Sequence, residues 1–410
     1  MLAKPQVKEH FYVLDAIRGI AALMVMLYHY NLAYHYKLQF NTYLAVDIFF
    51  ILSGFVISHS YAEKLRQGMT TTAYIIRRLA RLFPFAAIGT LLGLVALLIM
   101  YQQGQTDYTL IDVFTATFTN FLLLPTLINH YVTVSNAQAA GLIFPGNSPL
   151  WSIFFETIAS IAFIFLLRVS KSGLLATMQC CIIALLLMPL ALGTANLQRF
   201  VNIDGGWSAD TLIVGFPRVI YGFALGMLLY QLRGVRRLQP KGFSSLRAAC
   251  FNPLVICVLL VGVLAFPYTL KGVYGLVVIV CLAPAIVYLG SQSTTENPSA
   301  KKAMTFLGWL SFPIYCVHEP ILTITNLLMN ETSLFHSLHV FPGVLAGIVS
   351  IAFAIGFATL FDHMGLQNRI VKALEKLVLR RNDPVRIQSQ SDYITQLKKP
   401  MTSGNSVNKL

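Results

Sequence analysis

Two ionisable side chains stand eleven residues apart within the apolar stretch VLDAIRGIAALMVMLYHY, which covers residues 13–30. Arg18 lies near the beginning of this stretch and His29 near its end. Ionisable residues are costly inside membrane spans, so each one is a functional candidate by default. An imidazole can exchange protons near neutral pH, and a guanidinium can hold an anion. The pair therefore indicates polar chemistry inside a membrane helix.

Two carboxylates in other apolar segments extend this pattern. Asp47 begins the segment VDIFFILSGF, and Glu156 lies in NSPLWSIFFET. At ~1.5 Å of helical rise per residue, His29, Asp47 and Glu156 all belong to the outer side of the membrane, with Arg18 about 16 Å further in. A neighbouring carboxylate fixes the tautomer of a histidine and supports its imidazolium form. We therefore predict that Asp47 or Glu156 orients His29 as a general base.

An arginine cluster in the sequence IIRRLARLFP stands at the inner side. Guanidinium groups match phosphate oxygens, so Arg78 and Arg81 are candidates for binding a phosphate-bearing ligand, with Arg77 as a further candidate. His318, in SFPIYCVHEP just before Pro320, is another candidate inside a span. Such a layout would let a donor that enters from the cytoplasm react with an acceptor outside.

The elements that position these residues are predicted to be membrane helices. The chain has 410 residues, of which 56% are hydrophobic and 11% charged, so it is expected to be an all-α polytopic membrane protein. The short segment 112–127, which contains Pro125, is predicted to be a re-entrant or interfacial helix. Ten segments are long enough to span the membrane: 11–30, 43–61, 82–101, 150–168, 174–193, 212–230, 253–269, 272–290, 303–329 and 339–361.

The basic residues predict how these helices are oriented. With the N-terminus in the cytoplasm, cytoplasmic segments hold all 30 Lys and Arg except Arg18, Lys37, Arg199, Arg218 and Lys271. This asymmetry matches the positive-inside rule, so both termini are predicted to be cytoplasmic. The net charge of +14 is then explained by topology and lipid contact, with no need for nucleic acid. Residues 1–363 are expected to form the transmembrane domain, and 364–410 a basic, partly disordered tail.

Three other patterns have structural interpretations. The six cysteines contain no CxxC pair, so we expect no disulfide framework and no metal site. The first apolar run is interrupted by Asp15 and Arg18 and lacks a small-residue cleavage site, so it is expected to be part of the mature chain. The GxxxG pattern GFALG (222–226) predicts close helix packing.

Five motifs, in order along residues 11–361, resemble those of the acyltransferase family 3 membrane proteins. These O-acetylase-like enzymes modify bacterial surface glycans. The matching motifs are Arg/Lys-x10-His at Arg18 and His29, R-x-x-R at Arg78 and Arg81, and three signatures around Asp47, Glu156 and His318.

The resemblance implies a multi-pass enzyme of the bacterial cytoplasmic (inner) membrane. In the family an acyl group, usually acetyl, passes from acyl-coenzyme A to an extracytoplasmic hydroxyl of a glycan or other cell-envelope acceptor. Carried over, His29 is the catalytic histidine, Arg78 and Arg81 contact coenzyme A, and Arg18 holds the donor or the active-site geometry. An acyl-histidine intermediate stays open as an alternative to direct transfer.

Two departures from the family pattern leave the acceptor open. Many members have a second acidic residue after the glutamate of the Glu156 motif, whereas this chain has Thr157. Some members carry a fused extracytoplasmic hydrolase-like domain, and no such domain is evident in this sequence.

Two other functions remain open on sequence alone. A secondary transporter would use Arg18, His29 and Glu156 as a proton or substrate relay, and a broken helix at 112–127 fits such a protein. However, no paired half-repeats are evident. A membrane scaffold without chemistry would leave these costly charges unexplained.

The same residues also have purely structural interpretations. His29 lies between Tyr28 and Tyr30, as in an aromatic belt, and Asp47 suits a helix cap. Arg77, Arg78 and Arg81 are all typical of positive-inside anchors, and His318 could bond to the backbone of a neighbouring helix.

Overall fold

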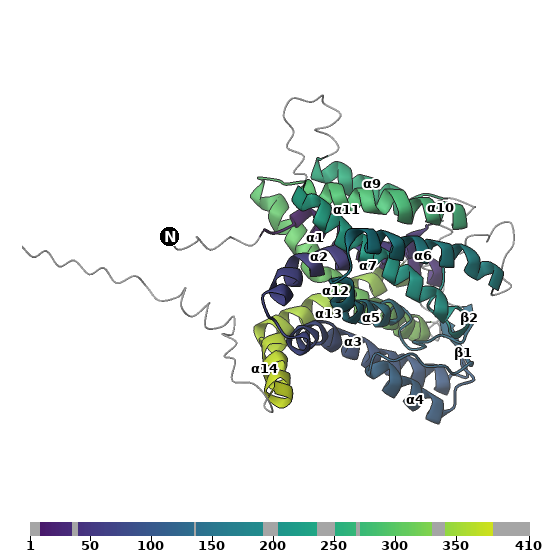
Figure 1. Ribbon diagram of the computed structural model, residues 1–410. Coiled ribbons are helices and arrows are strands. Elements are labelled where there is room, and N and C mark those ends of the chain that lie inside the picture. The colour runs from purple at the N-terminus through teal and green to yellow at the C-terminus, as the bar shows by residue number, and fades with distance from the viewer. Residues whose placement is uncertain are drawn as a thin grey trace, which may run out of the picture.

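A computed structural model describes residues 9–34, 40–134, 137–191, 204–235, 251–267, 271–329 and 341–379. Long helices run side by side, and two short strands pair at one end of the bundle (Figure 1). The α-helices are α1 (Tyr12–Tyr34), α2 (Ala45–Arg66), α3 (Thr71–Gln102), α4 (Leu110–Phe121), α5 (Leu150–Leu166), α6 (Lys171–Ala191), α7 (Leu212–Val235), α9 (Pro253–Ala265), α10 (Lys271–Val277), α11 (Ala283–Gln292), α12 (Pro298–Met329), α13 (Phe341–His363) and α14 (Leu366–Leu379). The other elements are η1 (Thr42–Leu44), η2 (Ala209–Thr211), the π-helical turn η3 (Val278–Leu282), β1 (Tyr131–Val134) and β2 (Ala137–Ala140).

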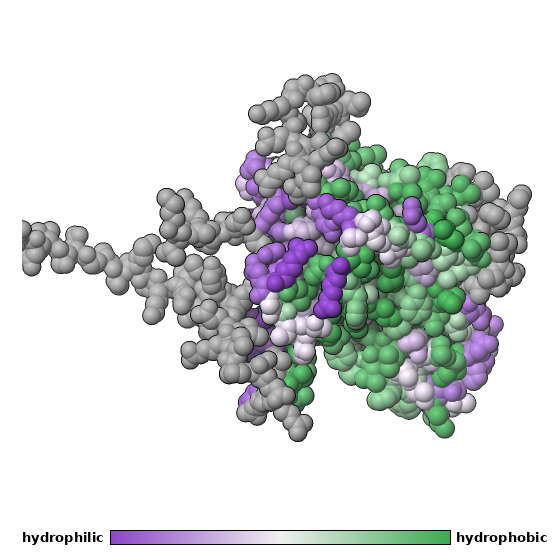
Figure 2. Space-filling model, viewed as in Figure 1, coloured by the Kyte–Doolittle hydropathy of each residue, from purple (hydrophilic) through white to green (hydrophobic). Residues whose placement is uncertain are grey.

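The protein is a helical membrane protein. The side of the bundle is mainly hydrophobic, and hydrophilic residues gather at its two ends (Figure 2). Leu150–Leu166 and Pro253–Ala265 are apolar but shorter than a span, and α12 is long but has polar side chains on its buried side. Seven helical segments of the described chain are long and apolar enough to cross a membrane: Tyr12–Asn31, Thr42–Arg66, Thr71–Gln102, Lys171–Met188, Ala209–Arg233, Gly272–Gln292 and Gly343–His363. The count of ten spans and the cytoplasmic location of the termini stay predictions.

The C-terminal tail contains one amphipathic helix. α14 lies across the end of the bundle at which α1 begins (Figure 1). Its last described residue is Leu379, so the remainder of the predicted tail, 380–410, lies outside the described residues.

The segment predicted as a re-entrant or interfacial helix is α4, which begins two residues earlier and ends six residues earlier than predicted. A capping box between Thr109 and Asp112 fixes its start. α4 packs against α3 and leaves Ile111, Phe114 and Phe118 exposed. A helix with one exposed apolar face and a capped start suits the membrane interface, which favours the interfacial alternative.

The antiparallel pair β1 and β2 is a small addition to a fold that is otherwise helical, as predicted. Tyr131 pairs with Ala140, and isolated bridges join Thr106 to Val132 and Leu142 to Ser208. A two-stranded hairpin is marginal alone, so these extra bridges to neighbouring segments help to explain its presence. Four-residue strands were too short to give a periodic signal in the sequence.

Close packing of α2 against α7 confirms the prediction from GFALG. A side chain at Gly222 would collide with Phe50, and one at Gly226 would overlap the carbonyl of Ile51. Only glycine lets the two backbones approach this closely.

A break in the hydrogen bonding of α12 pins the loop before α5. Pro320 has no N–H, so the carbonyl of Cys316, one turn earlier, loses its helical donor. The Asn147 Nδ2 atom donates to that carbonyl at 2.7 Å. This bond fixes the start of α5 beside the α12 segment that contains Tyr315 and His318.

Candidate active site

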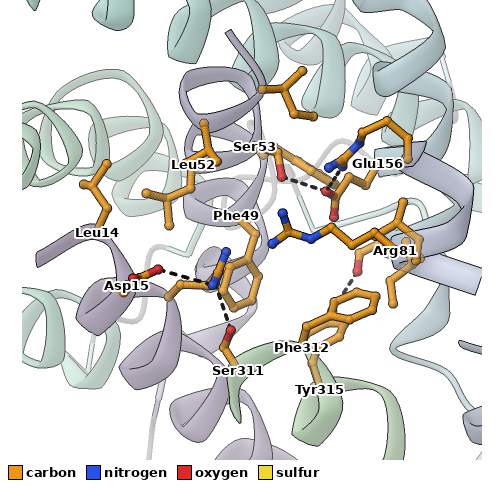
Figure 3. Close-up of a pocket in the computed structure, with 18 residues that line it drawn as sticks. Leu14, Asp15, Phe49, Leu52, Ser53, Arg81, Glu156, Ser311, Phe312 and Tyr315 are labelled. Atoms are coloured by element: carbon orange, nitrogen blue, oxygen red, sulfur yellow. Dashed lines mark hydrogen bonds and ion pairs between the residues drawn. The ribbon is translucent and has the colours of Figure 1, made fainter. Parts of the chain in front are cut away.

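A pocket with about 820 Å³ of empty space, its mouth included, lies between α1, α2, α3, α5 and α12. Apolar and aromatic side chains form most of its wall. Three guanidiniums and two carboxylates also line it, which gives a net formal charge of +1 (Figure 3). These charged residues are Asp15, Arg18, Arg78, Arg81 and Glu156.

Arg18 is fastened between α1 and α12. Its Nη2 atom donates to the carbonyl of Gly308 at 2.7 Å and lies 3.3 Å from Asp15 Oδ1. Its Nε atom donates to Ser311 Oγ at 2.9 Å. These bonds hold the half-buried guanidinium at one side of the pocket, where it offers a fixed positive charge.

Arg78 is buried and paired. Only 5% of the residue is exposed, and its Nη2 atom donates to Glu156 Oε1 at 2.8 Å. Its Nε atom lies 3.3 Å from Ser160 Oγ. Glu156 Oε1 also accepts a bond of 2.8 Å from Ser53 Oγ, so this carboxylate is part of the pocket wall.

Arg81 differs from the other two arginines because it is exposed to the pocket. Its side chain extends into the space between Glu156 and Phe49 (Figure 3). Within the described part of the chain, no hydrogen bond or ion pair engages its guanidinium. Its five N–H donors are therefore available to an anion such as a phosphate.

Arg77 does not line the pocket. Its Nη2 atom lies 3.3 Å from Glu375 Oε1 of α14, so it ties that helix to α3. This contact favours the structural interpretation of Arg77.

An aromatic path leads from the pocket toward His29. The Tyr315 hydroxyl lies in the pocket wall, 2.8 Å from Ser152 Oγ. The Tyr315 ring meets Phe49 edge-on and lies 5.9 Å from the His318 ring, measured between centroids. The His318 ring in turn lies 5.2 Å from the ring of His29.

His29 lies on the same face of α1 as Arg18, because eleven residues make about three helical turns. It is half-buried, and its buried Nδ1 atom has no hydrogen-bond partner among the described residues. The carboxylates of Asp47 and Glu156 bond to arginines instead. The prediction that either of them orients His29 therefore does not match the geometry.

Asp47 belongs to a sealed ion pair with Arg218. Arg218 Nε and Nη2 donate to the two oxygens of Asp47 at 3.1 and 2.8 Å. Arg218 Nη1 donates to the carbonyl of Gly205 at 2.7 Å, and the guanidinium lies over the ring of Trp151. With 2% of Arg218 exposed, this pair joins α2, α5 and α7 rather than facing a ligand.

Several residues of the site were not identified from sequence. Ser311 and Tyr315 stand seven and three residues before His318, a spacing that puts all three on one helix face and could have indicated them. Asp15 precedes Arg18 by three residues, which is a helical ion-pair spacing. No sequence pattern pointed to Ser53.

Comparison with known proteins adds independent findings. A family model described as an acyltransferase domain matches residues 11–362. A protein described as "Protein 2 in picA locus", from Rhizobium radiobacter, is 31% identical over 196 residues, which cover 46% of this chain and 95% of that protein. No solved structure gave a significant match.

Proposed function

This chain belongs to the acyltransferase 3 family, and from that premise we propose that it transfers an acyl group from cytoplasmic acyl-coenzyme A to an extracytoplasmic acceptor. The acceptor group is a hydroxyl of a glycan or another cell-envelope molecule. The observation that carries this proposal is the arginine-lined pocket that ends at Tyr315, beside two histidines.

The pocket chemistry suits an acyl-coenzyme A donor. Its phosphates would bind Arg81 first, because that guanidinium is unpaired in the described chain, with Arg18 and Arg78 adding positive charge. The apolar walls, which include Phe49 and Phe312, would enclose the pantetheine arm. That arm would carry the thioester toward Tyr315.

His29 is the proposed general base. It takes the proton from the acceptor hydroxyl as the oxygen attacks the thioester carbonyl carbon, and a tetrahedral oxyanion forms. Collapse of this intermediate breaks the C–S bond, and the imidazolium returns the proton to the departing thiolate. The products are the acyl ester and free coenzyme A.

Tyr315 is the proposed donor to the oxyanion. Its hydroxyl lies at the end of the pocket nearest to His318, and Ser152 Oγ lies close enough to bond to it. A hydroxyl held in a low-dielectric site stabilises developing negative charge without having to reorganise.

The orientation proposed for this reaction puts the pocket on the cytoplasmic side of the bacterial inner membrane. α14 and the beginning of α1 share one end of the bundle (Figure 1), and the pocket includes Leu14 and Asp15 of the first turns of α1. The basic tail and the positive-inside count support a cytoplasmic location for this end. A transporter is not favoured, because the family match covers residues 11–362.

The test uses purified protein in detergent with radiolabelled acetyl-coenzyme A and extracted cell-envelope glycan. Donor binding and label transfer are measured separately for the wild type, for His29→Ala and for a control variant, His363→Ala, at an exposed position. We expect His29→Ala to bind donor normally and to transfer no label, while the control matches the wild type. Absence of donor binding and transfer in the wild type would refute the proposal, and succinyl-coenzyme A tests the choice of acyl group.

A further inference from the structure

Two histidine rings face each other across the contact between α1 and α12. The rings of His29 and His318 lie 5.2 Å apart at 60°. His29 Nδ1 and His318 Nε2 are both buried, and neither has a hydrogen-bond partner in the described part of the chain. Because a buried polar atom without a hydrogen bond is destabilising, two such atoms on adjacent rings point to a shared interaction.

The backbone fixes the tautomer of His318. Its Nδ1 atom lies 3.0 Å from the carbonyl oxygen of Ile314. A carbonyl can only accept, so His318 Nδ1 carries the hydrogen. In the neutral ring Nε2 then has a free lone pair, and His318 can only accept at that atom. His318 is 0% exposed, so this lone pair is turned toward protein.

The usual partner for a catalytic histidine is a carboxylate, but the two predicted ones are engaged elsewhere. Asp47 is bonded to Arg218, and Glu156 to Arg78 and Ser53. The rings of Tyr28 and His318 both contact His29, and of the two only His318 has a buried nitrogen without a hydrogen-bond partner among the described residues.

We propose that His318 is a positioning residue whose Nε2 atom accepts the Nδ1–H of His29. This bond would hold His29 in the tautomer whose Nε2 lone pair faces the acceptor hydroxyl. A centroid spacing of 5.2 Å permits an N···N distance of about 3 Å once the two nitrogens point at each other. The χ2 torsion of His29 is soft, so its ring can turn the Nδ1 atom toward His318 Nε2.

The proton balance follows from this arrangement and rests on the proposed function. The acceptor proton moves to His29 Nε2 and then to the thiolate. His29 Nδ1 and His318 Nδ1 keep their own hydrogens throughout. His318 therefore acts through its hydrogen bond and gains no proton during the cycle.

Two substitutions at His318 separate this role from a packing role. In His318→Gln the amide Oε1 reaches the position of the ring Nε2 and can still accept, whereas His318→Leu fills space without an acceptor. We expect His318→Leu to lower kcat by about 10²–10⁴-fold with little change in the donor KM. We expect His318→Gln to recover at least about tenfold of that loss, with His363→Leu as a control for the substitution itself.

Equal kcat values for the Gln and Leu variants would overturn the proposal, since only a packing role would then remain. A second measurement needs no turnover, namely ¹⁵N spectra of histidine-labelled protein, with His29→Gln used to assign the His29 signals. We expect His29 to be protonated at Nδ1 in the wild type and to lose that preference in His318→Leu. If His29 is protonated at Nε2 in the wild type, the proposal is wrong even where acyl transfer is observed. If the tautomer is as expected but no acyl group is transferred, the proposed function fails and the positioning contact stands.

Discussion

The pocket around Arg81 and the pair between Asp47 and Arg218 contain the same kinds of charge and differ in how fully those charges are satisfied. Each of the three guanidinium nitrogens of Arg218 donates to an acceptor, the group lies over an aromatic ring, and the pair is sealed from solvent. Arg81 instead extends into open space with its donors unused in the described chain. A guanidinium whose nitrogens already bond within the protein has few donors left for a ligand, whereas an unpaired guanidinium can donate to one.

This difference assigns roles that motif matching cannot assign. Asp47 and Arg81 both fall in family-like motifs, yet Asp47 bonds within the protein and Arg81 faces the pocket. Substitutions in the two regions should therefore fail in different ways, one through folding and the other through donor binding.

The largest effect is expected in the sealed pair. Arg218→Met leaves the Asp47 carboxylate buried without its partner, which should cost about 3–5 kcal/mol of unfolding free energy. The double variant Asp47→Asn with Arg218→Met should regain part of the loss, because it removes the uncompensated charge. Thermal unfolding in detergent measures both. A single variant as stable as the wild type would show that the pair does not support the fold.

An intermediate effect is expected for Tyr315→Phe, which tests the end of the pocket nearest to His318. The ring contacts with Phe49 and His318 persist, and only the hydroxyl is lost. Loss of one oxyanion donor should lower kcat by about 10²–10³-fold with the donor KM unchanged. Steady-state kinetics with acetyl-coenzyme A measure this, and an unchanged kcat would leave the hydroxyl a purely structural contact to Ser152.

In the open region, Arg81→Ala should weaken donor binding without affecting the fold. Hydrogen bonds to charged groups contribute about 1.5–3 kcal/mol, which corresponds to a rise of roughly 10–100-fold in the donor KM. Arg66→Ala, at an exposed position on α2, is the matched control. A change in melting temperature with no change in KM would contradict the contrast with Arg218.

The smallest effect concerns the exposed start of α4. Hydrogen bonds from the Thr109 hydroxyl and backbone N–H lower the pKa of Asp112, with a smaller contribution from His130. A lowered folded-state pKa means that this stabilisation is present above the ordinary Asp pKa of about 4 and is lost as the pH falls through the folded value. The protection of the α4 amides, measured relative to intrinsic exchange at each pH, should therefore fall in acid for the wild type. The Asp112→Asn variant should show less protection of α4 than the wild type at neutral pH and lack this fall in acid, and identical protection profiles would contradict the assignment.

The sequence was enough to predict that Arg18, Arg78 and Arg81 lie near one another, and less able to predict the partners of the carboxylates. Helical rise gives the depth of a residue in the membrane, which is why Arg18, Arg78 and Arg81 were expected at one end, and they do converge on one pocket. Depth does not give the direction in which a side chain points around its helix. For that reason Asp47 was assigned to His29, when packing of α2 against α7 turns it toward Arg218.

The contact between α1 and α12 has a consequence for how this protein can change. Arg18 contacts Gly308 and Ser311, and eleven residues later His29 contacts His318. The two helices therefore run in the same direction. The alignment of α1 with α12 thus sets both the position of the Arg18 guanidinium and the position of the His29 ring. Inserting one residue into either helix between these two contacts would rotate one contact by about 100° relative to the other. Adaptation to a longer acyl chain or a different acceptor must then come from the pocket walls that α2 and α5 supply, while the spacing between Arg18 and His29 stays fixed.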